Sequence, residues 1–454
     1  MKFTKLRKLS SIAAALSVLA LAACGNDADE PAAVVNEPNN EVEAPAEEPT
    51  VEDVTFSFNW WGNDGRHDAT QAVANLFMEE NPHVYIDMQF GAWDGWQTTF
   101  AGDLMANTEA DLMQVNFNWL ALYSPFGDTF MDLEDPRIAA HLDLSNWNAA
   151  DIDVVRRNGV VQAVPVGMTA RVPFLRTDIY EAAGLDIQDI NTWEDLMAAG
   201  RQIQDVHGDE VFALSPLGAQ SMAYLVFSYI EQFTGRSFVN EEFQFNYSLE
   251  ELTRGFQLIQ DFMDNGVMPN GQFDSDPINA QNPLWIEGAY AGASEWDSSI
   301  NAWINNLKNG AEVIGIRDHF TYEGALSSGW MARPSMAFAI SRNTEHPEIV
   351  AEFLNFMLTD ERAIEIMGTD RGVPLNTVGR AYFDAHGFSG VAVEANALHA
   401  AADTTTMNPV FEFPEVREVY ESQLMAIFNG VSTVEEAATF VYENVQSVIN
   451  SLVD

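Results

Sequence analysis

The chain has 454 residues, of which 68 are Asp or Glu and 21 are Lys or Arg, so its formal net charge is −47. A chain this acidic lacks the basic surface that binds a phosphate backbone, which excludes nucleic acid as a partner. With 47% hydrophobic residues it can form a core, and its length predicts about two or three lobes. The single cysteine, Cys24, excludes intramolecular disulfides and cysteine-ligated metal sites.

The N-terminus has the pattern of a secretory signal peptide. A basic segment over residues 2–8 precedes an uninterrupted small and apolar stretch over residues 11–23, which is too short to span a bilayer. The stretch ends in Leu21-Ala22-Ala23-Cys24, which resembles the lipobox of bacterial lipoproteins, whose cysteine is lipidated and becomes the new N-terminus. We therefore expect residues 1–23 to be removed and Cys24 to anchor the protein outside the cell membrane. The alternative is an ordinary signal peptide that carries a cysteine.

An acidic tether follows over residues 24–52. Residues 25–50 contain eight acids and four prolines but no aromatic or basic residue, a composition that cannot form a core. Removal of residues 1–23 takes away four of the 21 bases, so the mature charge becomes 17 − 68 = −51. This excess of carboxylates suggests an extracellular surface exposed to high salt or high pH, with drift in composition as the alternative.

The folded part begins near residue 53 and alternates strand and helix patterns, which predicts an α/β fold. Its start reads as a parallel βαβαβ unit. The predicted strands are residues 54–60, 84–90, 111–115, 160–166, 172–175, 289–293, 313–316 and 335–340, and the predicted helices are residues 66–80, 96–106, 192–207, 219–233, 249–265, 277–287, 347–357 and 434–452.

Several kinds of chemistry are excluded by motif. Lys308 is followed by Asn309, so no phosphate-binding loop ends in Gly-Lys-Ser/Thr, and no Gly-x-Ser-x-Gly motif occurs. The eight histidines are far apart and do not form a His-Glu-x-x-His zinc helix. With 68 carboxylates in the chain, a pair at glycosidase-like spacing carries little information. We expect no metal, no cofactor and no catalytic residues.

Tryptophans follow the first three strands. Trp60-Trp61-Gly62-Asn63-Asp64-Gly65-Arg66 ends the first strand, Trp93 follows the second, and Asn116-Phe117-Asn118-Trp119 follows the third. Open α/β sheets bind ligands at the carboxyl ends of their strands. Sugars suit such a site, because their C–H faces pack on aromatic rings while their hydroxyls bond to amide, carboxylate and guanidinium groups. Core packing is the alternative for each tryptophan.

Similar residues recur in the later half of the chain. Glu295-Trp296-Asp297 and Gly329-Trp330 place tryptophans in predicted loops, and Arg371-Gly372-Val373-Pro374 reads as a turn that carries a guanidinium. The tryptophans at positions 147, 193, 285 and 303 lie in or beside predicted helices, which favours a structural role.

With these motifs, residues 53–454 resemble the extracellular solute-binding proteins of bacterial ABC importers, in the carbohydrate-binding family 1 that includes maltose-binding protein. The motifs around Trp61, Trp93, Trp119 and Arg371 are similar to a subgroup that includes oligogalacturonide- and other plant-oligosaccharide-binding proteins. The resemblance implies a two-lobe, periplasmic-binding-protein-like (type II) fold with a hinge and an interlobe cleft. Lobe 1 would comprise residues 53–170 plus about 318–375, and lobe 2 residues 171–317 plus about 376–454.

The resemblance also implies the residues of the cleft. The first lobe would contribute Trp60, Trp61, Asn63, Asp64, Arg66, Trp93, Asn116, Asn118 and Trp119, and Trp296, Asp297, Trp330 and Arg371 would complete the site. The segment from Gln97 to Leu104 departs from the pattern of the subgroup, where a lysine and a Thr-Gln pair are common.

The expected function is that of a monomeric, lipid-anchored protein that captures an oligosaccharide and delivers it to membrane permease subunits. Binding would favour lobe closure, because ligand contacts to both lobes exist only in the closed state. Two alternatives remain. A secreted glycoside hydrolase could use the same aromatic cleft, and the acidity would suit a binding protein for a cation such as a polyamine, although the arginines oppose it.

Overall fold

The computed structural model describes residues 52–453, except 241, 275–278 and 403. The predicted signal peptide, Cys24 and all of the predicted tether but Glu52 lie outside the described residues. The described chain contains two principal hydrophobic cores, and we call the two parts built around them lobe 1 and lobe 2.

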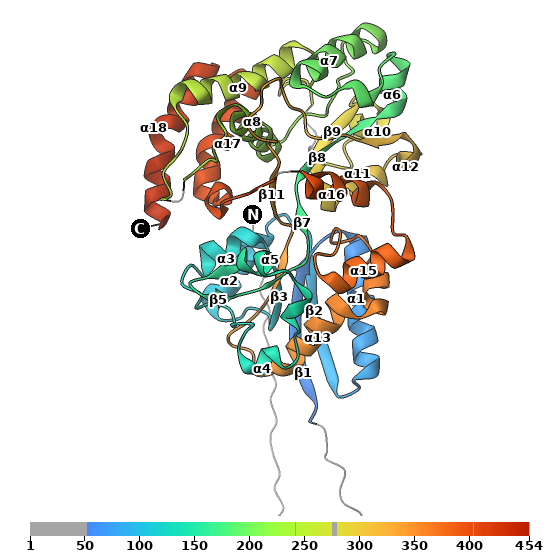
Figure 1. Cartoon of the computed structure of the whole chain (residues 1–454), viewed down its shortest axis with the longest axis vertical. Coiled ribbons are helices and arrows are strands. Elements are labelled where there is room, and N and C mark those ends of the chain that lie inside the picture. Colours follow the sequence, from blue (N-terminus) through green and yellow to red (C-terminus); the bar gives the residue numbers. More distant parts are fainter. Residues whose placement is uncertain (1–51, 241, 275–278, 403, 454) are drawn as a thin grey trace, which may run out of the picture. The chain divides into compact units, whose positions relative to one another are not determined.

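A five-stranded sheet forms the centre of lobe 1 (Figure 1). Its order is β2-β1-β3-β12-β6, with β1 parallel to β2 and β3, and β12 antiparallel to β3 and β6. The predicted parallel βαβαβ start is therefore confirmed. The strands are β1 (Val54–Trp61), β2 (Val84–Gly91), β3 (Leu112–Val115), β6 (Val164–Pro165) and β12 (Ala337–Ile340).

Helices cover this sheet because its strands are apolar. Phe56 and Phe58 of β1 are buried, and their rings lie 5.8 and 5.6 Å from that of Phe353 on a covering helix. The helices of lobe 1 are α1 (Asp64–Glu80), α2 (Trp96–Ala106), α3 (Phe117–Tyr123), α4 (Pro136–Ala139), η1 (Leu144–Asn146), α5 (Ala149–Asp153), α13 (Pro347–Thr359), α14 (Glu361–Met367) and α15 (Thr377–His386). A short hairpin joins β4 (Arg156–Arg157) to β5 (Val160–Val161).

Lobe 2 combines an antiparallel three-stranded sheet with a larger set of helices. The sheet has the order β10-β8-β9, with β8 (Arg171–Arg176) between β9 (Gly292–Trp296) and β10 (Ile314–Ile316). The helices are α6 (Thr177–Ala182), η2 (Ile187–Asp189), α7 (Trp193–His207), α8 (Ala219–Thr234), α9 (Leu249–Asp264), α10 (Pro283–Glu287), η3 (Asp297–Ser299), α11 (Ile300–Ile304), α12 (Gly310–Val313), α16 (Val391–Ala401), η4 (Pro409–Glu412), α17 (Pro414–Phe428) and α18 (Val434–Val453).

The helix starts of lobe 2 follow from local sequence. Thr192 and Asp195 form a capping box at α7, and Ser248 and Glu251 form another at α9, so two backbone N–H groups are satisfied at each start. α8 contacts both α9 and α17 and is buried over most of its length, which explains why its sequence is apolar almost all round.

A third small sheet joins the lobes. It has the order β13-β11-β7, where β7 (Met168–Thr169) is antiparallel to β11 (Met331–Pro334), and β13 (Thr405–Thr406) is parallel to it. Figure 1 shows β7 and β11 between the five-stranded sheet and the β8–β9 part of lobe 2. β7 lies in the break between the predicted strands 160–166 and 172–175.

Two predicted lobe boundaries need correction. Phe320 and Met331 pack in the core of lobe 2, so the chain returns to lobe 1 after β11 and not at about residue 318. Tyr382 and Phe383 of α15 pack against Ile364 of α14, so lobe 1 extends beyond residue 375, and the chain next enters lobe 2 at α16. In both places apolar packing partners, not sequence breaks, decide the boundary.

Two predicted elements are placed differently. The helix predicted over 277–287 begins at Pro283, because Asn282 caps it by accepting hydrogen bonds from the backbone N–H groups of Leu284 and Trp285. The strand predicted at 289–293 is β9, which runs from Gly292 to Trp296. The sequence analysis missed α15, α16 and α17. Within the described part of the chain, no helix is both long and apolar enough to span a membrane.

Candidate ligand-binding cavity

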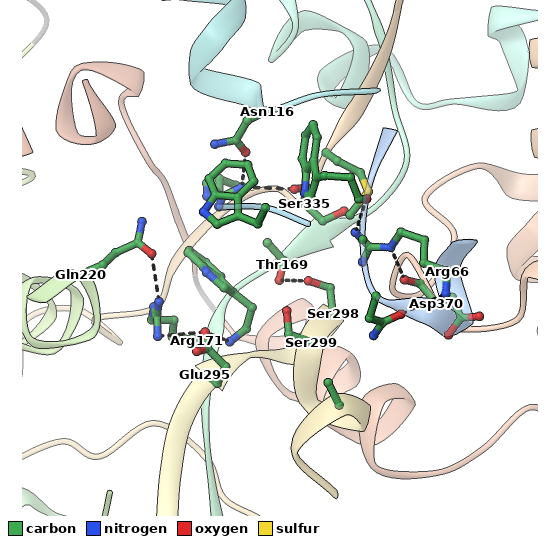
Figure 2. Close-up of a pocket in the computed structure, with 18 of the residues that line it drawn as sticks. Arg66, Asn116, Thr169, Arg171, Gln220, Glu295, Ser298, Ser299, Ser335 and Asp370 are labelled. Carbon is green, nitrogen blue, oxygen red and sulfur yellow. Dashed lines mark hydrogen bonds and ion pairs between the residues drawn. The ribbon is translucent and has the colours of Figure 1, made fainter. Parts of the chain in front are cut away.

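A cavity of about 400 Å³ lies where both lobes and the hinge meet. Its walls come from the ends of β1 and β3 and the loop after β2 on one side, and from β9, η3 and α11 on the other. Thr169 of β7 and Arg333 of β11 add the hinge. Figure 2 shows Arg66 and Asp370 on one side of the cavity, with Arg171, Glu295 and Gln220 on the opposite side.

Three tryptophans of lobe 1 form an aromatic cluster, and two of them line the cavity. Trp119 is fully buried, and Trp93 stacks on it with ring centroids 5.8 Å apart and an angle of 8° between the planes. Trp61 contacts both rings at 5.2 Å. Trp93 is 45% exposed and Trp61 7%, and both line the cavity. Trp119 therefore supports the two rings that a ligand can reach.

One tryptophan faces the cavity from lobe 2 and is held by two arginines. The Arg171 guanidinium lies 4.8 Å from the Trp296 ring centroid and that of Arg333 lies 4.3 Å from it. Such cation–π contacts fix the ring in one orientation. Arg171 Nη1 is 3.0 Å from Glu295 Oε1, and Arg333 Nε is 3.1 Å from Glu412 Oε1. Both charges are thus paired.

Amide groups connect the two walls. Asn116 donates through Nδ2 to Asn118 Oδ1 at 2.8 Å, and its Oδ1 accepts from Arg333 Nη1 at 3.2 Å. Asn118 Nδ2 donates to the carbonyl oxygen of Glu412 at 3.0 Å, which joins α3 of lobe 1 to η4 of lobe 2. Thr369 and Asn301 form a further link between lobes at 3.0 Å.

Some polar atoms of the cavity wall have no hydrogen-bond partner among the described residues. They are Arg171 Nε, Ser335 Oγ and Glu412 Oε2, together with Arg333 Nε, whose contact is the ion pair with Glu412. Buried polar groups are nearly always hydrogen-bonded in folded proteins. These atoms are buried, so the polar groups that a ligand can reach are partly exposed side chains of the same wall, such as Asn63 and Gln97.

The family of this protein follows from its sequence. Residues 63–364 match the family described as bacterial extracellular solute-binding protein, which is well over half of the chain. The chain belongs to this family. The two-lobe fold and the cavity between the lobes agree with that assignment.

Solved structures place this solute-binding protein among sugar-binding relatives. A periplasmic oligogalacturonide-binding protein of Yersinia enterocolitica, in complex with saturated digalacturonic acid, is 26% identical, with a TM-score of 0.83 over 88% of this chain and 100% of that one. A periplasmic solute-binding protein of Pectobacterium atrosepticum is also 26% identical, with a TM-score of 0.81 and the same coverage. The arabinooligosaccharide-binding protein of Halalkalibacterium halodurans is 22% identical over 66% of this chain and 68% of its own length.

Seven of the thirteen residues predicted for the site line the cavity of the solute-binding protein. They are Trp61, Asn63, Arg66, Trp93, Asn116, Asn118 and Trp296. Their contact with a ligand stays a prediction.

The other six lie elsewhere. Trp60 is fully buried, donates to His67 Nδ1 at 3.1 Å and stacks on Phe90, while Asp64 is exposed in the first turn of α1. Trp119 and Arg371 lie behind the wall, at 0% and 3% exposure. Trp330 is buried at the hinge, where its Nε1 donates to Asp318 at 3.2 Å.

Asp297, the sixth, is buried at the hinge of the solute-binding protein. Its Oδ1 accepts from the Thr169 hydroxyl and from the backbone N–H of Ser298, and its Oδ2 accepts from Asn396 at 3.0 Å and His399 at 2.9 Å. All four hydrogen bonds are internal. The carboxylate therefore links η3 to β7 and α16, directly beside two cavity residues, Trp296 and Ser298.

The sequence analysis missed six charged residues of the cavity wall: Arg171, Glu295, Arg333, Asp370, Glu412 and Arg417. A signal for two of them is present. Arg333 follows the apolar run Trp330-Met331-Ala332, and Glu412 stands between Phe411 and Phe413. A charge inside an apolar run must find a buried partner, and these two find each other across 79 residues of sequence.

Proposed function

We propose that this solute-binding protein binds an oligosaccharide in the cavity and delivers it to the permease of an ABC importer. The observation that carries the proposal is the combination of three reachable tryptophans, Trp61, Trp93 and Trp296, with partly exposed polar side chains such as Asn63 and Gln97 in the same wall. Sugar rings pack their C–H faces on aromatic rings and use hydroxyls as both donors and acceptors. The oligosaccharide-binding relatives support this ligand class.

Closure of the lobes would couple binding to delivery. The hydrogen bonds Asn118–Glu412 and Thr369–Asn301 already join the two walls. A ligand that contacts Trp93 on one side and Trp296 on the other adds free energy only when the walls are close, so binding shifts the hinge equilibrium toward the closed form. The permease would then recognise the closed surface.

The lining charges support a binding role over the alternatives. Four arginines and three acids line the cavity, which opposes a cationic ligand such as a polyamine. Of the two lining glutamates, Glu295 is paired with Arg171, and Glu412 is paired with Arg333 and accepts from the Tyr224 hydroxyl at 2.6 Å. Acids held in this way are poorly suited to shuttle protons, and the third lining acid, Asp370, has no second unpaired carboxylate beside it in the described cavity wall, so we propose that the protein performs no catalysis on its sugar.

The location follows from family and sequence. The protein acts outside the cytoplasm, as the family description states. We propose further that lipid on Cys24 holds it at the membrane, that residues 24–52 act as the tether, and that it works as a monomer without metal or cofactor. Among the described residues, no group of three or more His, Cys, Asp or Glu side chains could hold a metal ion.

Calorimetry and product analysis test the proposal together. The mature protein should bind at least one member of a panel of plant-wall oligosaccharides, with quenching or enhancement of tryptophan fluorescence, and a ligand at 100 times Kd should add about 2.7 kcal/mol to the free energy of unfolding. The recovered sugar should be unchanged in length. New reducing ends after prolonged incubation would favour a hydrolase, and no binding across the panel would contradict the proposal.

A further inference from the structure

Two buried guanidinium groups at one end of the cavity form no ion pair with a carboxylate of the described residues. Arg66, in the first turn of α1, is 9% exposed, and Arg371, in the loop between α14 and α15, is 3% exposed. Within the described residues, neither has an Asp or Glu oxygen within 4.0 Å. Buried arginines are normally paired, because an isolated charge in a protein interior is costly.

The hydrogen bonds of these two arginines go to neutral groups. Arg66 donates through Nε to the carbonyl oxygen of Asp370 at 2.9 Å and through Nη1 to that of Trp61 at 3.3 Å. Arg371 donates through Nε to Gln114 Oε1 at 3.2 Å and approaches Met367 Sδ at 3.5 Å through Nη1. Its Nη2 has no partner among the described residues.

The opposite end of the cavity is different, because each arginine there has an acid. Arg171 is paired with Glu295, Arg333 with Glu412, and Arg417 Nε lies 2.7 Å from Glu421 Oε1. Figure 2 shows Arg66 and Asp370 across the cavity from Arg171 and Glu295. Positive charge is therefore balanced at one end and in excess at the other.

Burial makes the excess costly. It lowers the pKa of Arg66 to about 10, and it lowers the pKa of Arg371 well below its usual value, with the charge on Arg66 adding to the effect. The pKa of the half-buried Asp370 is raised because burial disfavours its anion, although the charges on Arg66 and Arg371 oppose this shift. Asp370, whose ionisation is disfavoured, is thus the acid that interacts with both arginines. An added anion would be stabilised by the charges of Arg66 and Arg371.

We propose that the Arg66 end of the cavity is a subsite for one carboxylate of an acidic oligosaccharide, a uronic acid unit being the chemical class that fits. This inference rests on the proposed function. Arg66 lines the cavity and contacts the carboxylate, because a guanidinium can bind it through two parallel hydrogen bonds. Arg371 is a positioning residue behind it that supplies the second charge. The opposite end of the cavity, where each arginine is paired with an acid, binds a sugar unit through its hydroxyl groups.

The test compares digalacturonic acid with its neutral dimethyl ester, which has the same rings. Calorimetry on the mature wild-type protein should show the acid binding about 10- to 100-fold more tightly than the ester, the range of a charged hydrogen bond. Arg66→Gln and Arg371→Gln should each remove most of this ratio while ester binding stays within about threefold. Arg371→Lys, which keeps the charge, should retain a preference for the acid.

A matched control uses Arg317, another buried arginine that forms no ion pair within the described part of the chain. Arg317 donates to Gln188 Oε1, to the carbonyl oxygen of Ile190 and to Asn191 Oδ1, and it does not line the cavity. Arg317→Gln should change stability and leave the acid-to-ester ratio unchanged. If Arg371→Gln fails to fold, Arg371→Lys and Arg66→Gln carry the comparison.

The outcomes distinguish a failure of the proposed carboxylate subsite from a failure of the proposed oligosaccharide binding. Equal affinity for acid and ester, or binding of neutral arabino- and galacto-oligosaccharides alone, overturns the subsite while oligosaccharide binding stands. Binding of none of these sugars overturns both. Sodium sulfate titrated alone should give little thermal stabilisation. If it stabilises the wild type as much as digalacturonic acid does, and Arg371→Gln removes the effect, the subsite takes a free anion and the assignment to a sugar carboxylate is wrong.

Discussion

The imidazole Nε2 of His399 donates a hydrogen bond to Asp297 Oδ2 at 2.9 Å, and both side chains are 2% exposed. An ionised carboxylate can only accept, which fixes the proton on Nε2. Because Asp297 also accepts from Thr169 of β7, this pair ties α16 and the hinge strand to the segment that carries Trp296 and Ser298. The hinge and one wall of the cavity therefore share a buried polar network.

Asp297→Ala should weaken the protein through this network. The Thr169 hydroxyl, Asn396 and His399 would lose their shared acceptor, and unsatisfied buried donors make us expect a loss of about 1–3 kcal/mol in the free energy of unfolding. Urea denaturation measures it. Asp318→Ala, which removes the weaker contact with Trp330 at 3.2 Å, is the comparison and should cost less. Equal losses of unfolding free energy in the two variants would show that the Asp297 network contributes no more to stability than the single Asp318–Trp330 contact.

Trp93→Ala should weaken sugar binding with little effect on the fold. The ring is 45% exposed, so its removal takes a stacking face from the ligand, and aromatic hot spots are worth about 1–3 kcal/mol. Calorimetry and thermal unfolding measure the two effects separately. Trp285→Phe, in the core of lobe 2 away from the cavity, should lower the stability of the fold and leave the affinity for sugar unchanged. An unchanged affinity in Trp93→Ala would return that ring to a purely structural role.

Glu412→Gln should destabilise the protein more than Glu421→Gln does. Arg333 and Glu412 are 8% and 2% exposed, and removing one charge of such a pair leaves the other buried and uncompensated, which costs about 3–5 kcal/mol. Arg417 and Glu421 are 28% and 17% exposed, so water can solvate the remaining arginine. Chemical denaturation of both variants checks the order, and a larger loss in Glu421→Gln would contradict it.

Acid should destabilise the fold partly through His319. Burial lowers the pKa of His319 to about 4, below the ordinary value of 6.5, so the folded protein keeps this ring neutral while the unfolded chain protonates it. The unfolded state then binds more protons between pH 6.5 and 4, and stability falls as the pH drops through that window, by about 3 kcal/mol in total.

The difference between wild type and His319→Gln isolates this contribution from the other titrating groups. Unfolding free energies at pH 7 and pH 4 should show a smaller acid loss in the variant. If the two proteins lose the same free energy, His319 does not titrate in this way.

Cys24→Ala tests the proposed anchor. Without the thiol no lipid can be attached, so the variant should appear in the soluble fraction of a bacterial host, while the parent stays with the membranes. Fractionation followed by immunoblotting is the measurement. Partition of the variant into membranes as complete as that of the parent would refute lipidation at Cys24.

Much of lobe 1 was predictable because its signals are local. The alternation in residues 54–60 and the tryptophans after three successive strands placed the candidate site at the edge of the sheet where the cavity lies. α17 could also have been found, since Val416, Tyr420 and Leu424 keep helical spacing on its buried face.

The amino-acid sequence by itself thus determined the α/β class and the parallel start, because periodicity and strand ends depend on near neighbours, and together with the family resemblance it named seven residues that line the cavity. Only the tertiary structure decided which side chains are reachable. Trp60 and Trp61 are adjacent, yet the alternation of the strand points one into the core and the other toward the cavity. It also decided the partners: Arg333 pairs with Glu412, whereas Arg371 forms no ion pair with any acid of the described residues, since burial and long-range contacts set the cost of each charge.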